Sequence, residues 1–144
     1  MGKGNAFSNS LLNLTFNATA IANIADNAGS SPLTTLGVGL YTSSPGATGN
    51  QTTHEAAYTS YARVSVARTS SGWTATTSES TSPVAAITFP AATGGSETET
   101  YGAVGTLATT AAGVLLYFGT ITPNIVVSSG VTPQLTTGST ITEA

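Results

Sequence analysis

The sequence predicts an all-β protein, an antiparallel β-sandwich or jelly roll with a short N-terminal helix. The chain is rich in Ser, Thr, Val, Tyr and Gly, which together favour pleated structure over helix. Short apolar stretches separated by turn residues recur through the rest of the chain, as in sandwiches and barrels. Because the chain has no cysteine, the Cys-Trp-Cys landmarks of immunoglobulin-like sandwiches are missing, which favours the jelly roll.

The predicted helix begins near Asn5, where apolar residues from Phe7 to Phe16 fall at helical spacing. Further apolar residues continue this spacing, so the predicted helical arm covers about residues 5–28. The sequence Gly29-Ser-Ser-Pro32 then breaks the pattern. No repeat of fixed period and no linker divides the chain, and residues 1–144 are therefore predicted to form a single domain.

The first strands are predicted from apolar residues that alternate with glycine or polar residues. In Leu36–Leu40 the aliphatic residues share one face and glycines occupy the other, which indicates that another part of the backbone passes close to those glycines. Tyr61–Arg68 alternates in the same way. Residues 72–77 are predicted to be its hairpin partner, across a turn at residues 69–72.

The later strands are short and closely spaced. A hairpin is predicted between Tyr101–Leu107 and Val114–Thr122, around a turn at residues 109–113. The remaining strands are predicted at Val84–Phe89, Ile125–Val127, Thr132–Thr136 and Ser139–Thr142. This close and regular spacing of short strands is what predicts the sandwich.

Charge is scarce in this chain. Three Lys and Arg stand against six Asp and Glu, so clustered cations for binding phosphates are lacking and no nucleic-acid partner is predicted. Charged residues make up 6% of the chain, against about 25% in an ordinary soluble protein. Protein interfaces are depleted in Lys, Glu and Asp, so neighbouring proteins are predicted to cover much of the surface. The longest apolar run, Val114–Phe118, is far shorter than the ~20 residues of a membrane span, and no membrane partner is predicted.

No enzyme is predicted. His54 and Asp26 are the only histidine and the only aspartate, so a Ser-His-Asp triad is permitted by the counts, but no Gly-x-Ser-x-Gly motif singles out a nucleophile. We therefore interpret His54 as a solvated loop residue. The spacing of Thr52 and Glu55 is that of a capping box, in which Glu55 closes a helical turn.

Glu97 and Glu99 would share one face of an extended chain and make half of a site for a hard cation. A full site needs more oxygen ligands than this, so we interpret the pair as a solvated strand edge and predict no metal and no cofactor. Trp73 is an aromatic that stacks on sugars or bases in other proteins, but its place beside a turn favours an anchor in the core or at its rim.

Several segments together resemble a widespread group of small virion proteins of tailed phages. The segments are, in order, Leu40-Tyr-Thr-Ser-Ser-Pro45, Tyr61-Ala-Arg-Val-Ser-Val66, Phe89-Pro-Ala-Ala92 and the late hairpin of residues 101–122. Ser60 stands where this group commonly has glycine, and the late turn lacks an aspartate-rich stretch. Some members are labelled tail-fibre proteins; others resemble head cement, or decoration, proteins with a jelly-roll fold, such as that of a short-tailed phage.

The resemblance implies a structural capsid cement protein, made in the host cytoplasm and bound as a dimeric clamp to the outer surface of the head. Its implied partners are the major capsid protein and itself, as a homodimer or a trimer. A tail-fibre or tail-tip adaptor module is the alternative. Ends and long loops extend most readily towards neighbours, so the predicted partner-binding residues lie in the N-terminal helix and the polar loop after residue 42: Phe7, Leu11, Leu14, Pro45, His54 and Tyr58.

Overall fold

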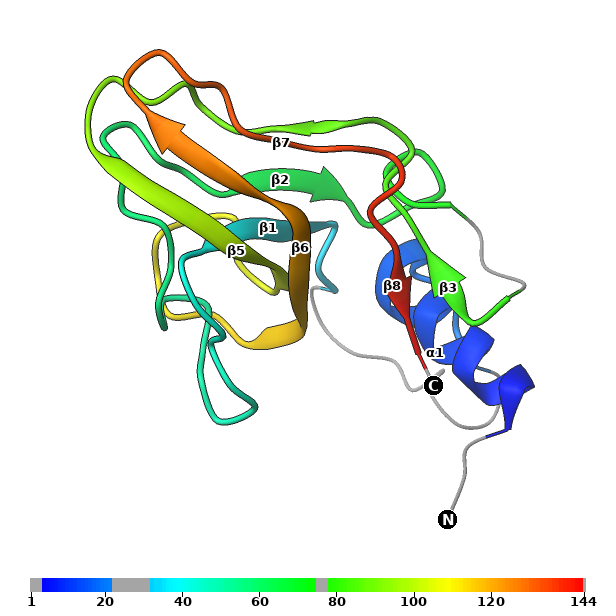
Figure 1. The fold of residues 1–144 in the computed structure, drawn as a ribbon. Helices are drawn as coiled ribbons and strands as arrows, with labels where there is room; N and C mark the ends of the chain where they lie inside the picture. The colour runs from blue at the N-terminus through cyan, green and yellow to red at the C-terminus, as the bar shows by residue number, and fades with distance from the viewer. Residues whose placement is uncertain (1–3, 22–31, 75–77, 144) are drawn as a thin grey trace. The chain divides into compact units, whose positions relative to one another are not determined.

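The computed structural model describes residues 4–21, 32–74 and 78–143, and its strands are antiparallel where their register is defined (Figure 1). The described residues contain one helix, so the predicted all-β fold class with a short N-terminal helix is confirmed. The elements are α1 (Asn5–Asn17), β1 (Thr35–Tyr41), β2 (Val64–Ala67), β3 (Ser80–Thr81), β4 (Ile87–Thr88), β5 (Ser96–Gly105), β6 (Leu115–Ser128), β7 (Gln134–Leu135) and β8 (Ile141–Thr142).

The strands form one larger sheet and two ribbons. The larger sheet has the order β2-β1-β5-β6, and the ribbons are β3-β8 and β4-β7. The chain divides into two compact units: the first holds residues 1–34, 67–86 and 135–144, and the second holds residues 35–66 and 87–134. Each unit is described by itself below, and the single domain stays a prediction.

The glycines of β1 leave room for other chain segments, as the sequence predicts. Leu36, Val38 and Leu40 are buried, with exposed fractions of at most 2%. A Cβ atom added to Gly37 would overlap the backbone carbonyl of Leu107. At Gly39 a Cβ would lie 3.0 Å from the hydroxyl of Tyr61, so the close approach there comes from a side chain.

The late hairpin is confirmed and is longer than predicted. β5 and β6 pair from Ser96 opposite Ser128 to Gly105 opposite Leu115, so the separately predicted strand Ile125–Val127 is the C-terminal part of β6. Residues 121–124 of β6 lie opposite Thr100 alone, because Glu99 pairs with Ile125 and Tyr101 with Thr120. Such a bulge bends a strand, and the bend in the middle of β6 is visible in Figure 1.

The hairpin predicted from Tyr61–Arg68 and residues 72–77 is wrong. β2 lies beside β1 in the sheet, and the turn after it leads the chain into another pairing. The N–H of Thr74 donates to the carbonyl of Ser82 over 2.9 Å, and that of Val84 donates to the carbonyl of Gly72 over 2.9 Å. Residues 75–77 lie outside the described residues. Alternation identifies a strand but not its partner, which is why the sequence misassigned the pairing.

The helix begins at Asn5 as predicted and ends earlier than predicted. Ala18 has a φ of 54°, in the left-handed region that terminates helices, and its N–H donates to the carbonyl of Asn13. Residues 18–20 are not helical, and residues 22–28 of the predicted arm lie outside the described residues. The last turn of α1 carries no basic residue of its own. Arg68 supplies the missing cation by donating to the carbonyls of Leu14 and Thr15.

The buried face of α1 packs on an aromatic anchor in the first unit. Ser8, Leu12 and Phe16 are fully buried on one side of the helix. The ring of Phe16 meets Trp73 edge to face at a centroid distance of 4.7 Å. Trp73 is 1% exposed, so the prediction that it anchors the core is confirmed.

Candidate functional site

A buried ion pair organises the polar loop that follows β1. The side chain of Arg63 is fully buried, and its Nε and Nη2 atoms donate to the two carboxylate oxygens of Glu55 over 2.6 and 2.7 Å. Two parallel N–H···O bonds of this kind are the strongest ion-pair geometry in proteins. The hydroxyl of Tyr61 donates to the same carboxylate over 3.0 Å. Glu55 is therefore an ion-pair partner, and its predicted capping role is wrong.

Arg63 also connects this loop to the turn between β5 and β6. Its Nη2 donates to the carbonyl of Gln51 over 2.9 Å, and its Nη1 donates to the carbonyls of Thr109 and Ala111. Burial by itself lowers the pKa of Arg63, but hydrogen bonding to Glu55 and the charge of Glu55 outweigh burial and raise the pKa above its usual value. The guanidinium thus stays charged and closes the loop onto the turn.

Gln51 makes a second connection to the same turn. Its side-chain Nε2 donates to the carbonyl of Leu107 over 2.9 Å, and the N–H of Leu107 donates to its Oε1 over 2.9 Å. The hydroxyl of Tyr41 donates to the backbone carbonyl of Gln51 over 2.9 Å, and burial raises the pKa of Tyr41 to about 12. The base of the polar loop is therefore fixed, and its exposed residues 47–48 form the tip.

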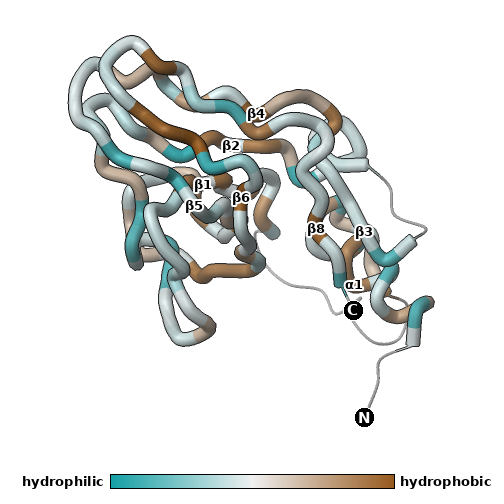
Figure 2. The backbone as a smooth tube through the Cα atoms, viewed as in Figure 1, coloured by the Kyte–Doolittle hydropathy of each residue, from teal (hydrophilic) through white to brown (hydrophobic). Residues whose placement is uncertain are grey.

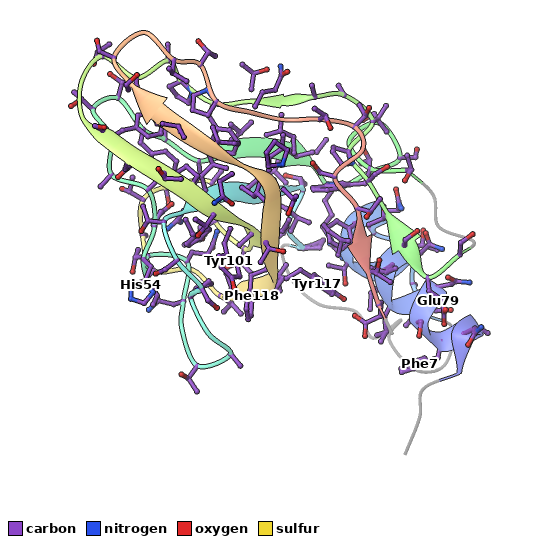
Figure 3. All side chains as sticks on the ribbon, in the orientation of Figure 1. Phe7, His54, Glu79, Tyr101, Tyr117 and Phe118 are labelled. Atoms are coloured by element: carbon purple, nitrogen blue, oxygen red, sulfur yellow. The ribbon has the colours of Figure 1, made fainter. Side chains whose placement is uncertain are left out.

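Three predicted partner-binding residues of this loop have different environments. Pro45 is buried, and Tyr58 is 3% exposed with its hydroxyl donating to the carbonyl of Pro90 over 3.0 Å, so both lie in the interior of the second unit and their role in binding a partner stays a prediction. His54 is exposed (Figure 3), with a φ of 59° and its Nδ1 2.9 Å from the carbonyl oxygen of Ser44. Asp26, the other member of the permitted triad, lies outside the described residues.

The interpretation of Glu97 and Glu99 as a solvated strand edge is wrong. Both lie in β5, and Glu99 is fully buried. The Oε1 atom of Glu97 accepts the N–H groups of Ala57 and Tyr58 over 2.9 and 2.8 Å. No donor among the described residues bonds to either oxygen of Glu99. Burial and, after it, the neighbouring Glu97 raise the pKa of Glu99 to about 8, so Glu99 is largely protonated at neutral pH.

The predicted contact residues of the helix remain accessible in the first unit. Phe7 is 43% exposed, and Leu11 and Leu14 are partly exposed. The spacing i, i+4 and i+7 places the three on one side of α1, beside the buried face of Ser8, Leu12 and Phe16. Their role in binding a partner stays a prediction.

A second accessible apolar surface lies on β6 in the second unit, and sequence reasoning missed it. Val114, just before the strand, is 64% exposed, and within the strand Phe118 is 40% and Val126 is 67% exposed. Figure 2 shows hydrophobic segments at both ends of β6. The signal in the sequence was a run of 14 residues, Leu115–Ser128, without a charged side chain.

Among residues 4–21, 32–74 and 78–143, no three His, Cys, Asp or Glu side chains gather where they would hold a metal ion. No helix within the same residues has the length and apolar character required to cross a membrane.

The sequence matches a known protein family. No curated protein matches the sequence. A family described as Gp80, podophage GP4 fiber I protein gp80, matches residues 2–143. Because that match covers nearly the whole chain, the chain belongs to the family of the podophage GP4 fiber I protein gp80 and is a structural protein of a bacteriophage particle.

Proposed function

We propose that this chain is a non-enzymatic structural subunit of a phage tail fibre, or of the tail tip that carries the fibre. The observation that carries the proposal is the match of residues 2–143 to a family named for a podophage fibre protein. This function was the alternative that the sequence offered beside a capsid cement protein. The family name supports it better than the cement function.

The use of charge inside the molecule supports a structural role. Arg63 is bound to Glu55 in the second unit, and Arg68 binds backbone carbonyls at the end of α1 in the first. Glu97 accepts backbone N–H groups, and Glu99 is buried. These charges hold loops and helix ends in place, so the accessible surfaces on α1 and β6 are left neutral and apolar. Surfaces of this kind suit contacts with other proteins of the particle.

A capsid cement protein is the second candidate function, because residues 40–45, 61–66 and 89–92 resemble a group of small virion proteins of tailed phages that includes head decoration proteins. In that case the major capsid protein is the partner and the outer surface of the head is the location. Many weak, uncharged contacts repeated over a shell would then combine into strong attachment. Neither function requires a cofactor, a membrane or a nucleic-acid partner.

Removing the chain from the phage separates the two functions. We expect particles made without it to have heads as resistant to heat as the wild type but to lack the fibre and to adsorb poorly to host cells. The measurements are release of DNA on heating, adsorption to cells and negative-stain images of the same preparation. Heads that release DNA at lower temperature, on tails whose fibres are intact, would instead support the cement function.

A further inference from the structure

We propose that a second copy of this chain pairs with the free edge of β6, so that two β6 strands join two four-stranded sheets into one continuous sheet. This pairing of two chains does not depend on whether they reside in the tail or in the head.

β6 is an edge strand with one unpaired side. In the order β2-β1-β5-β6, β5 pairs with one side of β6, and the described residues provide no strand for the other side. An edge of this kind presents a row of N–H and C=O groups that pair readily with another chain. Two groups of consecutive residues in β6 are regularly paired with β5, residues 117–120 and 125–128, and the bulge at residues 121–124 separates them.

The two edge strands of this sheet, β2 and β6, differ in how well they are protected against pairing with another chain. Natural proteins protect an edge by keeping it short, by charged side chains, by proline and by bulges. β2 has 4 residues. β6 has 14 residues and no charge, and its one proline, Pro123, lies in the bulge. The regular stretches of β6 on either side of that bulge, residues 117–120 and 125–128, contain neither a charged side chain nor a proline.

Exposed apolar side chains concentrate at the same strand. Of the six large apolar side chains exposed among the described residues, Val114, Phe118 and Val126 lie on β6 or next to it. Single exposed apolar residues are ordinary, but here half of the exposed large apolar side chains lie along one strand or just before it. Figure 3 shows Tyr117 and Phe118 on neighbouring positions of the strand, and the alternation of a strand directs them to opposite faces of the sheet.

The distribution of charge favours a second copy as the occupant. Each copy has a net charge of −3, yet β6 contributes nothing to it, so two β6 strands meet without like-charge repulsion. The nearest acids on β5 do not alter this, because Glu97 is bonded to the amides of Ala57 and Tyr58 and Glu99 is buried. A charged partner would meet no charged side chain on β6 with which to form an ion pair. An antiparallel pair about a two-fold axis satisfies both free edges with a single surface and closes the assembly.

Sedimentation equilibrium of the full chain tests the pairing. We expect the wild type to approach twice its 14.2 kDa monomer mass as concentration rises. Phe118→Lys should weaken the dimer about tenfold, because near the axis it places the lysines of the two copies opposite each other. Val84→Lys is the matched control: Val84 is a 47% exposed valine in the other unit, and this variant should dimerise like the wild type.

Disulfide cross-linking provides a second readout that does not depend on weakening the dimer. The natural chain has no cysteine, so one cysteine at a time placed along residues 115–120 reports its own environment. We expect oxidation to link two chains at one or more of these positions near the axis, and not in Val84→Cys. A wild type that stays monomeric at every concentration, or a dimer that Phe118→Lys leaves unchanged, would overturn the proposal. If the wild type is monomeric, the free edge of β6 is instead available to another virion protein.

Discussion

Replacing Arg63 by methionine is expected to lower the free energy of unfolding by about 3–5 kcal/mol, since the substitution leaves the buried carboxylate of Glu55 without its charge partner. It also removes the donors to the carbonyls of Gln51 and Ala111, which join the polar loop to the β5–β6 turn. A loss of this size is a large share of the stability of an ordinary domain, about 5–15 kcal/mol. Chemical denaturation followed by circular dichroism measures it.

Two companion variants identify the cause of that loss. In the double variant Arg63→Met, Glu55→Gln, the destabilisation should be clearly smaller than the sum of the two single effects, because the second change removes the buried charge that the first one isolates. Arg68→Met is the matched arginine control: Arg68 bonds only to backbone carbonyls in the contacts described above, and its loss should cost about 1–2 kcal/mol. Additive single effects would contradict a coupled ion pair.

Glu99→Gln is expected to stabilise the protein at alkaline pH and to flatten the dependence of its stability on pH. The pKa of Glu99 rises from 4.5 to about 8 on folding, so the folded state holds a proton that the unfolded state releases between these values. The favourable contribution of the protonated carboxyl is fully present below pH 4.5 and is lost as pH rises towards 8. The glutamine of the variant stays neutral throughout, and the gain at pH 8 should be on the order of 2 kcal/mol, at about 1.4 kcal/mol per unit with allowance for relaxation.

The measurement is the free energy of unfolding from pH 4.5 to pH 9 for the wild type and Glu99→Gln. Glu79→Gln serves as the matched control, because Glu79 lies in the other unit and is not fully buried, and its curve should run parallel to that of the wild type. Equal slopes for the wild type and Glu99→Gln over this range would show that Glu99 is ionised in the folded protein, in conflict with its burial.

Local patterns in the sequence were sufficient for much of the fold. Alternation identified Leu36–Leu40 as a strand, and its bare glycines correctly indicated the close approach of Leu107 at Gly37. Helical spacing located the start of α1 at Asn5, because the burial of Leu12 and Phe16 is periodic. Its end depended on the left-handed conformation of Ala18, a residue with no strong preference for terminating a helix.

Properties that depend on contacts between distant residues were not predicted. Glu55 and Arg63 are eight residues apart and meet only because the chain turns back on itself, while the spacing of Thr52 and Glu55 matched a local cap instead. Glu99 alternates in β5 as predicted, but its burial depends on what covers that face of the strand. The free edge of β6 required the strand order, which alternation does not contain.

The location of this chain in the phage particle is tested most directly by gold-labelled antibodies raised against it and imaged on intact virions. A fibre subunit predicts gold particles along the fibres or at their attachment to the tail, and bare heads. Gold spread over the surface of the head, with none on the tail, would contradict a fibre subunit and would support a capsid cement protein.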